Sequence, residues 1–392
     1  MSSSTFTIGQ HAIYTYNDIE QHGTPVDPGV EKTRPMILRA TRRPRVKVLT
    51  ENGSMRDEFV YLRQDEPQIP HAHRAYRRIP MKKTVKVRGG HVLFAVELYH
   101  VKDDIYQVSK KRVAIKKLHK KWFAMYLNAG GNEDPYNAIQ RMQTFGDDVH
   151  VLSCIEALED KTYLYTVMPF CEGGSLMDLM PWNGRGMMED EARLIYGKIL
   201  QNLHYLQAHN ICHHDLSPDN ILQLNGKLVF SDLAMSLMVP NGSGKRQLIN
   251  AQSPFGKPPY WTPEVLVSQR PFDAYQLDVW ASGCVLYNLV TTMMLFYKPH
   301  FSDVLFGYFL MAGGLSDRAM NHRAVEGLID TFQVNERDQQ PLFERAMVHL
   351  NLSSDMVVLL EGILKPNPRE RWSLAQIMES SWMTQWLEPK QL

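Results

Sequence analysis

Residues 213–220 read His-His-Asp-Leu-Ser-Pro-Asp-Asn, and residues 231–234 read Ser-Asp-Leu-Ala. The first stretch places Asn220 five residues after Asp215, and the second places Asp232 twelve residues further on. Short apolar runs between the two stretches predict a small hairpin. A loop followed by a hairpin can bring these three oxygen-bearing side chains into one pocket.

Two carboxylates and an amide at this spacing supply the groups that phosphoryl transfer from ATP requires. One carboxylate orients the attacking hydroxyl, and the other oxygen atoms hold magnesium on the phosphates. A second interpretation of Asp215 is a loop aspartate that bonds its own backbone, an ordinary role beside a turn. The offset of Asn220 favours the catalytic interpretation.

The two stretches resemble the catalytic loop and the metal-binding loop of eukaryotic protein kinases. Other segments resemble further landmarks of that family in the same order: the nucleotide-contacting strand, the strand and hinge, the end of the activation segment, the central helix and a late arginine loop. These segments are 113–116, 163–176, 259–264, 278–283 and 366–372. The resemblance covers roughly residues 83 to 386, and it identifies a divergent member of the Ser/Thr kinases.

The resemblance implies an α+β, bilobal protein kinase fold. A small, strand-rich N-lobe is expected at residues 83–168, and a large helical C-lobe at 169–386. Residues 1–82 then form an N-terminal extension of unknown role, and 387–392 form a tail. The length of 392 residues agrees, because it is too long for one ordinary core and predicts two or three packed units.

The resemblance also gives roles to single residues. Asp215 becomes the catalytic base, Lys116 the catalytic lysine that contacts the phosphates, and Asn220 and Asp232 the magnesium ligands. The residues expected to bind ATP are Gly89, Val96, Ala114, Lys116, Met168, Phe170, Cys171, Ser175, Leu222, Asn220 and Asp232. Among supporting residues, we expect Asp278 to bond the backbone of the catalytic loop, and Glu264 to form a buried ion pair with Arg371.

Several positions around Lys116 depart from the family pattern. Of the three glycines expected in the phosphate loop, Gly89 remains, while His91 and Phe94 take the other places. Ala138 stands where the helix of the small lobe normally carries the Glu that pairs with the lysine. These departures favour an alternative function, a pseudokinase that acts as a nucleotide-binding or scaffolding module.

Two further departures form a pair. Ser217 replaces the Lys that Ser/Thr kinases place two residues after the catalytic Asp, and Lys257 stands where the activation segment usually has Thr. We hypothesise that the ammonium of Lys257 approaches Asp215 and stabilises its ionised form. The alternative is that Lys257 points into solvent or toward a substrate phosphate. Gly256 and the segment 259–264 favour Ser/Thr over tyrosine as acceptor.

Composition excludes several classes of protein. Hydrophobic residues make up 44% and charged residues 22%, as in a soluble globular protein, and the net charge of +1 favours neither specific nucleic-acid binding nor membranes. Four cysteines without paired spacing, and a start that lacks the features of a signal peptide, indicate an intracellular and cytoplasmic protein. Residues 279–297 carry no charge, but their polar side chains predict a buried core helix, not a transmembrane segment.

The chain before residue 83 contains short alternating runs at 46–49 and 58–62 that predict strands. Two basic clusters, at 32–47 and 74–88, could form a docking surface for an acidic partner, a membrane or nucleic acid. The alternative is that they are solvated strand and loop faces. Further along, the pattern predicts strands at 84–87, 92–98 and 112–118, one helix of the small lobe at 135–142, and an amphipathic helix at 189–209.

Overall fold

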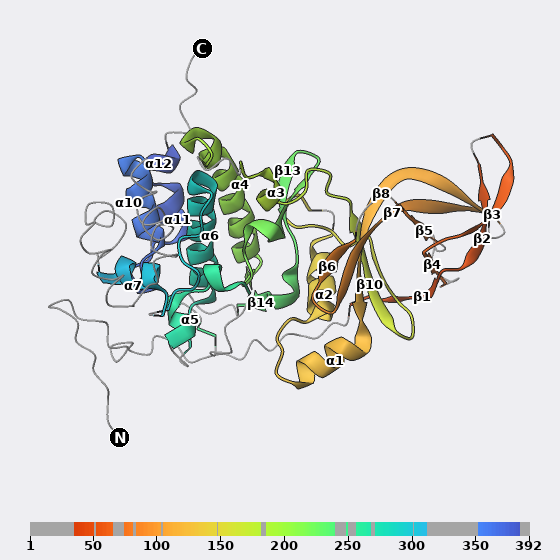
Figure 1. The fold of residues 1–392 in the computed structure, drawn as a ribbon, viewed down its shortest axis with the longest axis horizontal. Coiled ribbons are helices and arrows are strands. Elements are labelled where there is room, and N and C mark those ends of the chain that lie inside the picture. Colours follow the sequence, from red (N-terminus) through yellow and green to blue (C-terminus); the bar gives the residue numbers. More distant parts are fainter. Residues whose placement is uncertain are drawn as a thin grey trace, which may run out of the picture. The chain divides into compact units, whose positions relative to one another are not determined.

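The computed structural model describes residues 35–50, 52–65, 74–80, 84–102, 105–146, 148–181, 186–239, 248–249, 256–267, 271–300, 302–311 and 352–384. The predicted tail and parts of both basic clusters lie outside these residues. The chain divides into two compact units, with boundaries at Leu176, Asn220 and Met235. The strand-rich unit holds the described residues up to Leu176 and residues 221–235, and the helical unit holds the rest of the described chain from Met177 onward (Figure 1).

The strand-rich unit is built around a closed ring of strands. The strands of the ring are β1 (Leu38–Arg42), β4 (Leu62–Gln64), β5 (Ala75–Arg78), β7 (Gly90–Lys102), β8 (Ile105–His119), β9 (Glu156–Glu159) and β10 (Tyr163–Pro169). They pair in the order β7–β8–β10–β9–β1–β4–β5, and β5 pairs again with β7. Strands from the predicted extension therefore belong to the same sheet as those of the predicted N-lobe. Closure into a barrel leaves the ring without a free edge.

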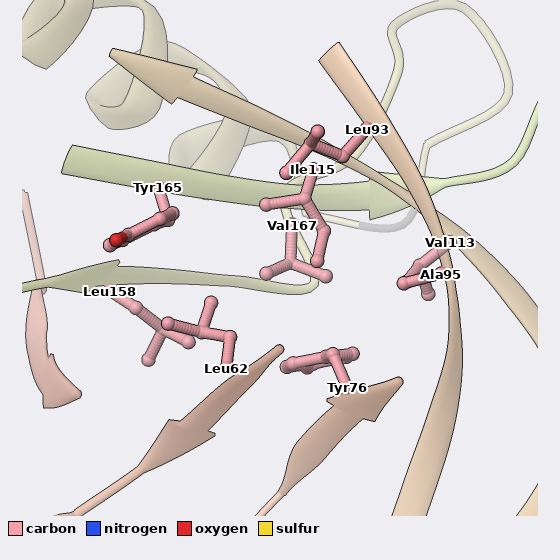
Figure 2. Close-up of a cluster of buried hydrophobic side chains, with 9 residues drawn as sticks. All are labelled: Leu62, Tyr76, Leu93, Ala95, Val113, Ile115, Leu158, Tyr165 and Val167. Carbon is pink, nitrogen blue, oxygen red and sulfur yellow. The ribbon is translucent and has the colours of Figure 1, made fainter. Parts of the chain in front are cut away.

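Side chains fill the interior of this barrel. Figure 2 shows its core cluster, in which buried residues from six ring strands point toward one another. The cluster consists of Leu62, Tyr76, Leu93, Ala95, Val113, Ile115, Leu158, Tyr165 and Val167. Because strand residues two apart share a face, Val113 and Ile115 of β8 point inward while Ala114 and Lys116 point to the opposite face.

The remaining elements of this unit lie outside the ring. Strand β6 (Val85–Val87) pairs with β7, β2 (Arg45–Leu49) pairs with β8, and β3 (Met55–Phe59) pairs with β2. The helix α2 (Pro135–Phe145) starts with Pro135 and is capped by the side chain of Asp134. Its Ile139 packs against Ala157 and Leu164, on the sheet face that is turned away from the barrel interior.

The predicted strands at 46–49, 84–87, 92–98 and 112–118 lie in β2, β6, β7 and β8 and are confirmed. The run at 58–62 was predicted as one strand, but it divides between the end of β3 and the start of β4. The prediction of a single helix in the small lobe was wrong, because α1 (Lys120–Asn128) precedes α2. Phe123 is its one buried residue, so α1 lacks the apolar stripe by which a helix is recognised in a sequence.

The helical unit packs around α6 (Ala274–Thr291), a helix that is buried along nearly its whole length. The helices α4 (Glu189–Ala208) and α10 (Ser354–Ile363) pack against it. The unit also contains α3 (Leu176–Leu179), α5 (Pro263–Val267), α7 (Val304–Met311), α11 (Leu374–Met378), α12 (Ser381–Thr384) and the short strands β11 (Ile211–Cys212) and β14 (Leu237–Met238). The predictions for 189–209 and for a buried helix at 279–297 are confirmed, although α6 ends at Thr291. None of the helices in the described segments has the length and apolarity needed to span a bilayer.

Candidate active site

Lys116 lies on β8 of the strand-rich unit, on the face opposite the barrel core. Its ammonium forms a bidentate ion pair with the carboxylate of Asp232, with Nζ at 2.8 Å from Oδ1 and 2.9 Å from Oδ2. The Lys116 side chain is 13% exposed and that of Asp232 33% exposed. Asp232 has φ of +59°, in the left-handed region that Asp tolerates better than most residues. The lysine whose usual glutamate is absent therefore has an aspartate as its partner.

The loop of Asp232 is attached to the start of α2. The backbone N–H of Asp134 donates to the carbonyl of Ala234 at 3.1 Å. Leu233 and Ala234 are buried in the 3-10 turn η3 (Leu233–Met235), which fits their apolar character. Ala138, at the place of the usual helix glutamate, is buried on α2. Position 138 thus offers Lys116 no charge, and the segment beside α2 supplies it instead.

The place of the phosphate loop is taken by a tight turn between β6 and β7, with Val87 paired to Gly90. Gly89 has φ of +67°, and a Cβ there would lie 2.5 Å from the Trp122 ring of α1. The guanidinium of Arg88 pairs with Glu133 at 3.1 Å. The turn is therefore attached to α1 by close packing and to the start of α2 by an ion pair.

The predicted adenine-binding residues line one face of the sheet and the segment after it. Ala114 pairs with Phe94 on one side and with Met168 on the other. The ring of Phe94 meets the ring of Phe170 edge to face, with centroids 5.3 Å apart. The second part of this surface is an apolar cluster that contains Met168, Cys171 and Leu222.

Hydrogen bonds fix the segment after this cluster. Ser175 bridges to Leu222, which lies on β12 (Ile221–Leu224) of the hairpin with β13 (Lys227–Phe230). Burial raises the pKa of the Cys171 thiol to about 11, so this thiol stays protonated at neutral pH. The surface is thus mainly apolar, which suits a flat heteroaromatic ring.

Asp215 lies in the helical unit, on the loop that follows β11. The side-chain amide of Asn220 donates to the Asp215 carbonyl at 2.7 Å and to its carboxylate Oδ2 at 2.9 Å. Asn220 closes the 3-10 turn η2 (Pro218–Asn220) and is buried. Its amide nitrogen faces Asp215, so its oxygen points away from that carboxylate. Asn220 thereby holds the orientation of Asp215 and presents an oxygen atom elsewhere.

Asp278 of α6 bonds the backbone of the same loop, as predicted. Its carboxylate accepts bonds from the backbone N–H of His213 at 2.6 Å and of His214 at 2.9 Å. Burial raises the pKa of Asp278 to about 6, although the two backbone N–H groups counteract it. His214 has φ of +66°, a conformation that the two bonds to Asp278 help to hold.

Two residues of the activation segment contact the catalytic loop. Gly256 has φ of +75°, and a Cβ there would lie 2.5 Å from Oδ1 of Asp215, so a side chain at 256 would collide with the carboxylate. The ammonium of Lys257 donates to Oγ of Ser217 at 2.6 Å and pairs with Asp219 at 3.1 Å. Lys257 therefore contacts the position that carries Lys in the family, and its proposed contact with Asp215 stays a hypothesis.

The expected pair of Glu264 and Arg371 is present. The guanidinium forms a two-pronged ion pair with the carboxylate, at 2.9 and 3.1 Å, and both side chains are buried. Arg371 also donates to the carbonyl of Gln276 on α6 at 2.8 Å. The pair joins α5, α6 and the late arginine loop within one unit.

The predicted site residues fall into two groups. The strand-rich unit holds Gly89, Val96, Ala114, Lys116, Met168, Phe170, Cys171, Ser175, Leu222 and Asp232, and the helical unit holds Asp215 and Asn220. Sequence reasoning missed Asp232 as the partner of Lys116 and Ser217 with Asp219 as the partners of Lys257. The second omission had a signal, since position 217 loses a Lys where position 257 gains one. The first had none, because the two residues are 116 positions apart.

Comparison with known families gives one match over most of the chain. The model of the protein kinase domain matches residues 100–383. The match begins inside β7, so β1 to β6 lie before it. The helical unit and the strands from β8 onward are thus the parts that follow a known pattern.

Curated relatives agree with this match. The chain is 28% identical to the sperm motility kinase Tcr mutant form of Mus musculus, over 61% of this chain and 41% of the relative. It is 27% identical to the serine/threonine-protein kinase SIK1 of Mus musculus, over 71% and 30% of the two chains. With the serine/threonine-protein kinase chk1 of Schizosaccharomyces pombe it shares 24% identity, over 71% and 50%. The chain thus spans half or less of the length of these relatives.

Proposed function

This chain belongs to the protein kinase family, and we propose that it transfers the γ-phosphoryl group of ATP to Ser or Thr hydroxyls of protein substrates. The observation that carries the proposal is the bonding of the catalytic loop. Asn220 bonds both the backbone and the carboxylate of Asp215, while Asp278 bonds the two preceding N–H groups. Such a loop holds a carboxylate in one orientation, which is what catalysis by positioning requires.

In this proposal Asp215 accepts the proton of the substrate hydroxyl as the oxygen attacks phosphorus. The adenine ring of ATP lies against Ala114, Met168 and Leu222. Lys116 binds phosphate oxygens and so reduces the negative charge that opposes attack. Oxygen atoms of Asn220 and Asp232 are the ligand type that magnesium prefers, and magnesium bound there would neutralise phosphate charge.

Two observations support Ser or Thr as the acceptor. Gly256 and Lys257 bring the activation segment onto the catalytic loop, where Lys257 bonds Ser217. An ammonium near residue 217 is the feature that Ser/Thr kinases obtain from a Lys at that position. The names of two relatives, SIK1 and chk1, describe serine/threonine-protein kinases.

The proposal includes an intracellular location. All four cysteines, Cys154, Cys171, Cys212 and Cys284, are free thiols. Free thiols, of which Cys212 and Cys284 are buried, suit a reducing compartment. A cytoplasmic enzyme with protein substrates is therefore the form of the proposal that we adopt.

A second candidate is a nucleotide-binding scaffold without turnover. The ion pair of Lys116 with Asp232 favours it. The pair engages both the ammonium that would bind phosphate and the carboxylate that would bind magnesium. The tight turn at Gly89 favours it too, since a short turn offers few backbone N–H groups to phosphates. For the enzyme, Lys116 and Asp232 would exchange this ion pair for contacts with phosphate and with magnesium.

The test measures phosphoryl transfer to a generic Ser/Thr peptide and to the protein itself. Asp215→Asn should lower the rate by roughly 10²- to 10⁴-fold, while the Kd for ATP changes little. Glu191→Gln is the matched control, because that carboxylate is exposed on α4. If the unaltered protein binds ATP and transfers no phosphate, the scaffold is correct and the enzyme proposal fails.

A further inference from the structure

One end of the barrel is lined by basic and aromatic side chains. Lys117 follows Val113 and Ile115 on the inward face of β8, and Tyr163 precedes Tyr165 on the inward face of β10. Arg42 continues the inward face of β1, and Arg78 that of β5. Tyr61 and Tyr163 pack directly on the core cluster. We call the set Arg42, Arg43, Arg78, Lys117, Tyr61 and Tyr163 the basic mouth.

Lys117, Arg42 and the two tyrosine rings of the basic mouth are in contact, and the charge of Arg78 acts on Tyr61. The Lys117 ammonium lies 3.9 Å from the centroid of the Tyr163 ring and 6.0 Å from that of Tyr61. The guanidinium carbon of Arg42 lies 4.7 Å from the Tyr163 centroid. Two cations therefore share one ring, and the backbone N–H of Arg43 bonds the Tyr61 carbonyl at 2.9 Å beside them.

Positive charge exceeds negative charge at this place. Among the described residues, Asp160 is the carboxylate that acts on Lys117, and its oxygens accept bonds from Thr162, Tyr163 and Tyr165. Arg42 reaches Asp160 only at 3.9 Å. Burial and the nearby charges of Arg42 and Arg43 lower the pKa of Lys117, although Asp160 opposes this. Like charges held together in this way lower stability unless an anion joins them.

We propose that the basic mouth binds a small anion carrying phosphate groups. Guanidinium and ammonium groups provide charged N–H donors, and those of Arg42 and Lys117 meet at the Tyr163 ring, an arrangement that suits phosphate oxygens. Tyr61 adds a hydroxyl donor, since burial raises its pKa to about 12 and keeps it protonated. The site would give the two basic clusters of the sequence a common role, because Arg42 and Arg43 come from one cluster and Arg78 comes from the other.

The basic mouth is separate from the nucleotide-binding face. Lys117 points to the interior side of β8, whereas its neighbour Lys116 points to the opposite face and pairs with Asp232. Three of its cations lie on strands or turns before the segment that matches the kinase family. The proposed site is thus a property of the part of the sheet that precedes the family match.

The test is calorimetric titration of the whole chain with tripolyphosphate at low salt. We expect saturable binding that weakens as salt rises. Arg42→Gln with Lys117→Gln should weaken it by about tenfold or more, since charged donors make the stronger hydrogen bonds. Arg78 is exposed, so Arg78→Gln should fold normally and weaken binding by a smaller factor.

Two controls locate the anion. Lys116→Gln removes the cation on the opposite face of the same strand, where the proposed function places the phosphates of ATP, and saturable binding at the basic mouth should persist in this variant. Lys47→Gln with Arg56→Gln removes the same charge as the double variant from exposed positions on β2 and β3, and should also change little. The proposal is overturned if the unaltered chain does not bind tripolyphosphate. It is equally overturned if Lys116→Gln abolishes binding while the basic-mouth variants retain it.

Discussion

The catalytic loop of the helical unit and the phosphate-facing side of the strand-rich unit differ in how their key residues are held. Asp215 is held by Asn220, five residues away, and by Asp278 of the buried helix α6. Lys116 is held by Asp232, which is 116 residues away and stands in for a glutamate that Ala138 has replaced. The first arrangement follows the family pattern, and the second departs from it.

The difference shows which parts of the pattern can be rebuilt. Asp215 and Asn220 would touch the reacting atoms, so their chemistry admits few substitutes. The partner of Lys116 needs only to be a carboxylate within reach, and α2 and the phosphate turn can be fixed by other contacts. In the strand-rich unit these other contacts are the ion pair of Arg88 and Glu133 and the strands that close the sheet into a barrel.

The largest effect on stability should come from the barrel core. Leu62 of β4 is fully buried among side chains from five other ring strands. Leu62→Ala should lower the free energy of unfolding by about 2–5 kcal/mol, because it leaves a cavity in a closed interior. Urea unfolding would measure this, with Leu62→Met (below ~1.5 kcal/mol) and the exposed Phe59→Ala as controls. A loss below ~1 kcal/mol would show that the strands before residue 83 are not integral to the unit.

A smaller effect, and one that depends on pH, should come from Asp278. Its pKa is raised to about 6 in the folded protein, against ~3.9 in an unfolded chain. The folded state therefore binds this proton more tightly, and the stability contributed by the protonated group is complete below pH ~4. It falls by up to ~3 kcal/mol as the pH rises from ~4 to ~6 and is constant above that range.

Asp278→Asn removes this titration. As the pH rises from ~4 to ~6, the unaltered protein should thus lose unfolding free energy relative to the variant. Chemical unfolding at closely spaced pH values measures it. A difference that is independent of pH would contradict the raised pKa. It would mean that burying the ionised carboxylate of Asp278 does not lower the unfolding free energy of the helical unit.

The smallest effect should come from the exchange of Ser217 and Lys257. The ion pair of Lys257 with Asp219 is half exposed, so Lys257→Thr should change the unfolding free energy by less than ~1 kcal/mol. If the ammonium beside Ser217 assists transfer, kcat/KM should fall several-fold, and adding Ser217→Lys should restore part of it. A double variant no more active than Lys257→Thr would remove this role. It would leave the contact as a structural one.

The sequence by itself determined the parts of the molecule whose partners are close along the chain or belong to a fixed pattern. Asp215 and Asn220 were placed by their spacing, and Asp278, Glu264 and Arg371 by landmarks that follow in order. The strands and the long helices were visible through alternation and through runs of apolar residues. These features survive in a sequence because each is encoded locally or repeated across a family.

Tertiary structure alone decided the partner of Lys116, the closure of the barrel and the basic mouth. Alternation shows which side chains of β1, β4 and β5 share a face, but it does not show which strand each of these strands pairs with. Pairing joins Leu38 to Leu158 and Ala75 to Leu98, across long stretches of chain. Such pairing depends on register and on packing between distant segments, and neither is written in the local pattern. The same holds for Arg42 and Lys117, which share a tyrosine ring because β1, β9, β10 and β8 pair in that order across the sheet.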